Sequence, residues 1–129
     1  MPSGHTSASL VETLTALREQ VTGVSESALS TVDGLLLAAD ADAFHPESVA
    51  ALSATTLSIG RRMALEAGGG ALRDVVIRSA GRHIVVRSVG ERALLTVVGD
   101  EGLDLAGLRR EVHHAVERLA AILADDAPA

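Results

Sequence analysis

The residues that could do chemistry are five histidines and seventeen carboxylates, in a chain of 129 residues without cysteine. His113 and His114 are adjacent on an expected helix, so their side chains point in different directions and do not form a chelating pair. Because cysteine and an H-E-x-x-H arrangement are both absent, no metal site is expected. His83 lies on an expected strand, as a surface residue rather than a catalytic base.

The remaining reactive patterns are equally unspecific. The carboxylate pairs Asp100-Glu101 and Asp125-Asp126 fall in an expected turn and tail, where charges are normally solvated. The glycines 68–70 lead out of an expected helix, whereas a phosphate loop leads into a helix N-terminus. No nucleophile, base and orienting group can be assembled from the sequence. We therefore expect a protein that is not an enzyme and carries no cofactor.

Charge and composition exclude further classes of function. The formal net charge is −6, which disfavours non-specific nucleic-acid binding, and Phe44 is the sole aromatic residue available for base stacking. No apolar run approaches the length of a membrane span, and the polar residues 1–8 lack the hydrophobic region of a signal peptide. The sequence thus predicts a soluble cytoplasmic protein.

The pattern of elements predicts an α+β domain. Three segments rich in β-branched residues are each closed by a glycine, which is typical of an antiparallel meander. Two earlier strands joined by Asp33-Gly34 predict a hairpin with a type I′ turn. Helices are expected from Ser9, within a capping box to Glu12, from Pro46 to about residue 67, and after Asp104. The expected strands cover residues 24–32, 35–39, 72–80, 82–89 and 93–98.

The resulting order is α-β-β-α-β-β-β-α, in one domain over residues 9–124 with flexible tails at 1–8 and 125–129. The last strand carries Leu94 and Val98 on one side and Leu95 and Val97 on the other. A sheet that is apolar on both faces needs helices on both, and three helices can be divided as two and one.

Three segments carry a resemblance to a known family. They are Ser30-Thr-Val-Asp-Gly-Leu-Leu-Leu-Ala38, the small-residue second helix that ends in glycines, and residues 85–98, which read V-V-R-S-V-G-E-R-A-L-L-T-V-V. In order and spacing they resemble the roadblock family of dynein light chains, and within it the bacterial gliding-motility (MglB-like) proteins. The resemblance covers about residues 9–123.

The resemblance implies a roadblock-like, five-stranded antiparallel sheet with the first and last helices on one face and the second helix on the other. It also implies a homodimer through the second helix and third strand, and a Ras-like small GTPase as partner. Similar actinobacterial proteins look like parts of operons that also encode a sensor histidine kinase. The chain lacks a G-x-x-x-x-G-K-[ST] loop, so it is not itself the GTPase.

The second helix is the best candidate for an interface. One stripe of it is expected to cover the sheet: Val49, Leu52, Thr56, Ile59 and Met63. Beside this stripe runs a small-residue strip, suited to close approach of a dimer partner or another protein: Ala51, Ala54, Thr55 and Ser58. The alternative is a helix that merely fills space with alanine.

Arg61 and Arg62 stand beside the small-residue strip and could contact an acidic partner or GTPase surface. A role as an arginine finger is disfavoured by the resemblance, because the gliding-motility relatives act without an inserted arginine. An arginine pair on a helix is otherwise a solvated face.

The third strand, with Arg73, Val75 and Ile77, is a candidate sheet edge that two-fold pairing would cover. Alternatively Arg73, Asp74 and Arg78 blunt this edge in a monomer.

The expected function is a regulatory homodimer that binds a Ras-like small GTPase and modulates its nucleotide cycle, with GTPase activation as one form of this. One alternative is a non-catalytic scaffold that links a sensor histidine kinase and a GTPase. A less favoured alternative is a small-molecule sensor that uses the cleft between sheet and helix.

Overall fold

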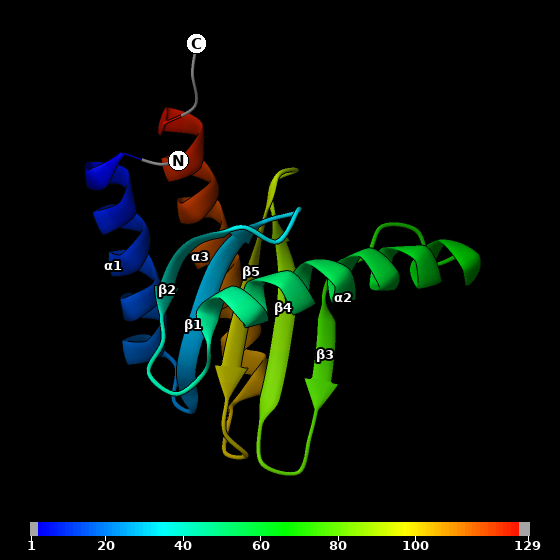
Figure 1. Cartoon of the computed structure of the whole chain (residues 1–129). Helices are drawn as coiled ribbons and strands as arrows, with labels where there is room; N and C mark the ends of the chain where they lie inside the picture. Colours follow the sequence, from blue (N-terminus) through cyan, green and yellow to red (C-terminus); the bar gives the residue numbers. More distant parts are fainter. Residues whose placement is uncertain (1–2, 127–129) are drawn as a thin grey trace.

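A computed structural model describes residues 3–126 and contains three helices and a five-stranded antiparallel sheet (Figure 1). The predicted α-β-β-α-β-β-β-α order is confirmed. The elements are α1 (Gly4–Gln20), β1 (Val24–Thr31), β2 (Leu36–Asp40), α2 (Pro46–Glu66), β3 (Val75–Arg78), β4 (His83–Val89), β5 (Ala93–Gly99) and α3 (Leu105–Asp126).

The strands lie in the order β2-β1-β5-β4-β3, so β3 forms one edge of the sheet as predicted. Strand β5 is central and buried at every position, and it pairs Leu95 with Leu29 of β1 and Val97 with Val85 of β4. The β-branched and leucine-rich sequence of β5 suits a strand covered on both faces.

Helices α1 and α3 cover one face of the sheet and α2 crosses the other (Figure 1). This confirms the predicted division of the helices. The core beneath α1 and α3 is large and includes Leu14, Leu95 and Leu119, whereas the core beneath α2 is built around Leu57, Val86 and Leu94. The alternation of Leu94 and Leu95 along β5 supplies both cores.

Helix α1 begins at Gly4, five residues before the predicted start at Ser9. The Ser3 side chain caps the helix by accepting a hydrogen bond from the Thr6 amide at 3.1 Å. Ser9 is internal, and its carbonyl oxygen accepts from the Thr13 hydroxyl at 3.0 Å. Residues 4–8 of the expected N-terminal tail are therefore helical. The polar residues before Leu10 hid this start, because they add no apolar periodicity.

The far end of α3 stabilises this start. The Thr6 hydroxyl donates to Asp126 Oδ1 at 2.8 Å, which joins the first turn of α1 to the last turn of α3. Asp125 and Asp126 belong to α3, although they were placed in the expected C-terminal tail. Residues 1–2 and 127–129, the rest of the two expected tails, lie outside the described residues.

The β1–β2 turn is not the predicted type I′ turn. That turn needs positive φ at both central residues, but Gly34 has φ +90° while no described non-glycine residue has positive φ. The Gly34 amide bonds to the Thr31 carbonyl at 3.0 Å and the Thr31 amide to the Leu35 carbonyl at 2.8 Å. The loop is thus three residues long, with glycine at its last position.

Strand β3 is shorter than predicted. The sequence favoured a strand over 72–80, but only Val75–Arg78 pairs with β4. Leu72 instead packs against the core beneath α2. At the other end of the meander, the predicted cap of α3 is confirmed, because Asp104 Oδ1 accepts from the Gly107 amide at 3.0 Å.

Candidate interaction surface

Small side chains seat α2 on the sheet. Its buried residues are Ala50, Ser53 and Leu57, at helical spacing. The Thr96 hydroxyl of β5 donates to Ser53 Oγ at 2.7 Å inside this contact, so the polar pair is satisfied. Gly60 lies against β3, where a Cβ would come within 2.7 Å of Val75 Cγ2. The helix can therefore approach the strands closely.

The stripe predicted to cover the sheet points largely elsewhere. Leu52, Ile59 and Met63 are 68%, 56% and 66% exposed, and we call these three residues the outer apolar face of α2. The prediction was wrong in the rotation of the helix about its axis, because two neighbouring stripes have helical spacing. The stripe with the smaller side chains, Ala50, Ser53 and Leu57, fits the shallow core above Val86 and Leu94. The stripe with the larger side chains is largely exposed to solvent.

The start of α2 is fixed by local caps. His45 is the N-cap, with Nδ1 accepting from the Ser48 amide at 3.3 Å, and Pro46 occupies the first helical position as predicted. Glu47 lies in the first turn, where a carboxylate is favourable. These residues determine where the outer apolar face of α2 begins.

A buried carboxylate holds the loop before α2. Glu26 of β1, whose side chain is 4% exposed, accepts three backbone hydrogen bonds at Oε2, from Asp42 at 3.1 Å, Ala43 at 3.1 Å and Phe44 at 2.9 Å. Its Oε1 lies 3.5 Å from Arg82 Nη1. Burial alone would raise the pKa of Glu26, but these amides and Arg82 together hold it below its ordinary value.

Sequence analysis missed Glu26. The available signal was an acidic residue between Ser25 and Ser27, in an expected strand of a sheet that helices were expected to cover on both faces, where charges are rarely buried without partners. Its partners are amides of a loop sixteen to eighteen residues further along the chain. No spacing rule links such positions.

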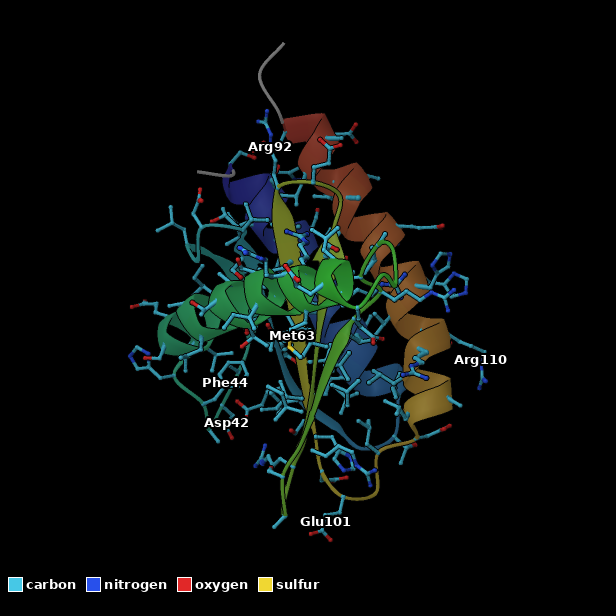
Figure 2. The ribbon with its side chains drawn as sticks, turned by 90° about the vertical axis from the view of Figure 1, so that its right-hand side faces the viewer. Asp42, Phe44, Met63, Arg92, Glu101 and Arg110 are labelled. Carbon is cyan, nitrogen blue, oxygen red and sulfur yellow. The ribbon has the colours of Figure 1, made fainter. Side chains whose placement is uncertain are left out.

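An apolar groove of about 660 Å³ runs between α2 and the sheet. Glu26 and Arg82 stand at its polar end. Figure 2 shows Met63 and Phe44 on the same lower side of α2. The apolar side chains that line the groove are Ala43, Phe44, Val49, Leu52, Ile77, Ile84, Val86 and Val98. The groove therefore joins the outer apolar face of α2 to the edge strand.

The small-residue strip is gathered on another side of α2. Ala51, Ala54, Thr55 and Ser58 line a hollow beside the β1–β2 turn, together with Ile59. Ala54 is partly buried against the sheet, and the other three are exposed. Gly34 of the turn lies so close that a Cβ there would be 3.2 Å from Ala51 Cα. The strip is thus a shallow concave surface.

The two arginines of α2 diverge. Arg62 lies 3.7 Å from Glu66 across one helical turn, and both side chains are exposed. Its spacing from Ser58 and Thr55 continues the small-residue strip. Arg61 lines a different hollow with Leu65 and Leu72. Only Arg62 therefore extends the strip.

Of the expected edge residues, Val75 and Ile77 lie on β3 and Arg73 precedes it. Val75 packs against the core beneath α2, and Ile77, 40% exposed, lines the apolar groove. Arg73 lines a separate hollow with Arg87 and Arg109. Within residues 3–126, β3 pairs with β4 alone.

The described residues contain no group of three or more histidine, cysteine, aspartate or glutamate side chains arranged to hold a metal ion. His113 and His114 have ring centroids 6.0 Å apart at a steep angle. Across residues 3–126, no helix combines the length and apolar character needed to cross a membrane.

Comparison with known proteins agrees with this geometry. The family model described as Roadblock/LC7 domain matches residues 10–99. No curated protein matches the sequence.

Three solved structures of related proteins share the fold. A Roadblock/LC7 domain from Streptomyces avermitilis superposes with a TM-score of 0.83 at 24% identity, over 88% of this chain and 97% of that one. Myxococcus xanthus MglB gives 0.86 at 18% identity, over 100% and 97% of the chains. An MglB described as having a tetrameric arrangement gives 0.86 at 23% identity, over 97% and 95%.

Proposed function

We propose that this chain, which belongs to the Roadblock/LC7 domain family, is a self-associating regulatory subunit that binds a Ras-like small GTPase and modulates its nucleotide cycle. The similarity to MglB structures and the roadblock resemblance of the sequence support this role. The chain would act through binding rather than through catalytic residues of its own.

The observation that carries the proposal is the outer apolar face of α2. Leu52, Ile59 and Met63 are more than half exposed, and Leu52 also lines the apolar groove. Contiguous exposed apolar surface of this kind marks interaction sites in proteins. A second copy related by a two-fold axis would cover it and could extend the sheet through β3. The tetrameric arrangement described for one MglB supports self-association in this fold.

The GTPase would bind at the small-residue strip and Arg62. This surface is concave and lies beside the β1–β2 turn, on a different side of α2 from the apolar groove. The outer apolar face of α2 shares Ile59 with this hollow, but the small-residue strip and Arg62 are not part of that face and would stay accessible when a second copy covers it. A surface that binds the GTP-bound switch conformation more tightly shifts the GTPase towards that conformation. Acceleration of hydrolysis would follow only where that conformation positions the attacking water.

The self-association step is tested by sedimentation velocity on wild type, Ile59→Arg and the matched control Val11→Arg. Val11 is 39% exposed and lies on α1, across the sheet from α2. We expect dimers for wild type and Val11→Arg, and monomers with an unchanged circular dichroism spectrum for Ile59→Arg. A monomeric wild type at micromolar concentration contradicts this step.

The GTPase step is tested by pull-down from host lysate in the presence of a GTP analogue or GDP, followed by hydrolysis assays with the captured GTPase. Preferential capture with the GTP analogue, lost in Ser58→Arg, is the expected result. Equal capture in both states with unchanged hydrolysis would favour the scaffold that links a GTPase and a sensor histidine kinase. Capture of no GTPase would overturn the proposal.

The apolar groove favours a second candidate, a small-molecule sensor. Its volume of about 660 Å³ is that of a typical ligand pocket. Ligand binding there would raise the unfolding temperature of the monomeric Ile59→Arg variant, in which no second copy competes for the groove. A screen without any such shift argues against this candidate.

A further inference from the structure

The hollow lined by Arg73, Arg87 and Arg109 has a volume of about 650 Å³ and opens between α3 and the start of β3. Its lining shares no residue with the apolar groove, and three of its seven residues are Arg73, Arg87 and Arg109. The chain has eleven basic residues and a net charge of −6, so this concentration of positive charge runs against the whole molecule. We call it the basic hollow.

Arg87 gives the basic hollow a partly buried charge. It lies two residues from Val85 and from Val89, which belong to the core beneath α1 and α3, so it shares their strand face and points towards α3. Its Nη2 donates to His113 Nδ1 across 3.4 Å, since a guanidinium has no acceptor. On the other side of the ring, His113 Nε2 lies 3.1 Å from Glu117 Oε1. Arg87 is thus held in place without a carboxylate in direct contact.

The charges of the hollow are not balanced. Asp74 is its sole acidic lining residue, and Asp74 Oδ2 lies 3.8 Å from Arg109 Nε. Among residues 3–126, Arg73 and Arg87 form no ion pair. Three guanidinium groups therefore face one carboxylate in a concave space.

We propose that the basic hollow binds a small, multiply charged oxyanion, namely the phosphoryl group of inorganic phosphate, pyrophosphate or a small phosphate ester. Guanidinium groups match phosphoryl oxygens with paired, charge-assisted hydrogen bonds. The volume is that of a small-molecule site. The lining contains no aromatic ring, so it recognises charge and offers no stacking surface for a nucleobase.

The test is calorimetric titration of the full chain with pyrophosphate, inorganic phosphate and glycerol 3-phosphate at physiological ionic strength, where diffuse surface attraction is screened. Binding confined to the inorganic ions would identify a free anion as the ligand. Binding of glycerol 3-phosphate as well would identify an ester. Absence of saturable binding by all three would overturn the proposal.

Two variants and one control locate the site. We expect Arg87→Gln to weaken binding about tenfold or more, and the double variant Arg73→Gln/Arg109→Gln to do the same at exposed positions that leave folding intact. The control is Arg110→Gln, because Arg110 points away from the sheet on the outer side of α3 (Figure 2). Its affinity should stay within about twofold of wild type. Equal losses in all three variants, or none in any, would overturn the proposal.

The basic hollow does not rest on the proposed function. Its titration can be repeated on the monomeric Ile59→Arg variant, in which the outer apolar face of α2 is altered and the three arginines are unchanged. Retained phosphate binding there, with GTPase capture absent from every variant, would leave the anion site standing and the GTPase proposal rejected.

Discussion

At the scale of single residues, Glu26 does the most to define the surface. It is a buried carboxylate on an interior strand of the sheet, and its partners are the three amides that lead into α2. Such an arrangement orders a loop through hydrogen bonds to its backbone. The position of Phe44 at the apolar groove follows from it.

Replacement of Glu26 tests whether its hydrogen bonds to the loop before α2 stabilise the protein. We expect Glu26→Gln to lower the free energy of unfolding by about 1–3 kcal/mol, because an amide accepts fewer and weaker hydrogen bonds from the loop. Urea denaturation followed by circular dichroism measures this, since the chain has no Trp or Tyr. The control is Glu19→Gln, at an exposed position of α1. Equal free energies of unfolding for the two variants would show that the hydrogen bonds of Glu26 do not stabilise the protein.

The same carboxylate gives a pH dependence. The folded-state pKa of Glu26 is lowered, so its contribution is complete above the ordinary glutamate value of about 4.3 and is lost as pH falls through the folded-state pKa. We expect the stability difference between wild type and Glu26→Gln to shrink over that acidic range. Urea denaturation at a series of pH values from neutral to about pH 3 measures it. A constant difference down to that pH would contradict the lowered pKa.

At the scale of elements, the rotation of α2 decides which residues are core and which are interface. Leu57 is 1% exposed and Leu52 is 68% exposed, although both are leucines five residues apart on one helix. Leu57→Ala should destabilise the chain by about 2–5 kcal/mol through loss of buried contacts. Leu52→Ala in the monomeric Ile59→Arg background should change the free energy of unfolding by no more than about 0.5 kcal/mol. Denaturant titration of both variants measures this, and the reverse ranking would restore the stripe predicted from sequence.

The junction between α1 and β1 depends on a glycine. Gly23 has φ +95°, and a Cβ there would lie 2.7 Å from the Leu103 Cα, a backbone atom that cannot move aside alone. We expect Gly23→Ala to cost about 2 kcal/mol or more in unfolding free energy. Gly81→Ala is the matched control, because no atom lies within 4 Å of its added methyl group and its φ is not positive. Thermal unfolding by circular dichroism compares the two.

Sequence analysis reached the element order and the division of helices because β5 carries apolar side chains on both faces and because Pro46 and Asp104 mark helix starts. The prediction was wrong where two different sets of residues on one helix had the same helical spacing. On α2 the stripe of Leu52 and the stripe of Leu57 both have helical spacing, and only the depth of the core beneath chooses between them. It also missed Glu26, since the partners of this residue are backbone amides that carry no sequence signature.

At the scale of the whole molecule, the two faces of the sheet differ in how fully their apolar side chains are covered. The face under α1 and α3 has a large closed core, whereas the face under α2 has a small one with apolar side chains left exposed. A second copy would complete this face, so stability and association should be linked. We expect the unfolding temperature of wild type to rise with protein concentration, while that of Ile59→Arg stays constant. Thermal scans over a hundredfold concentration range distinguish these outcomes.

The hydrogen bond between Thr6 and Asp126 has a practical meaning for chain connectivity. It places the beginning of α1 and the end of α3 side by side (Figure 1). The covalent order of the elements can therefore be closed into a ring by a short linker and reopened elsewhere. The exposed β3–β4 turn around Gly81 is a suitable place for the new ends. In a circular permutant opened there, the new ends lie at the sheet edge and can carry a fluorescent label. The linker would join the start of α1 covalently to the end of α3.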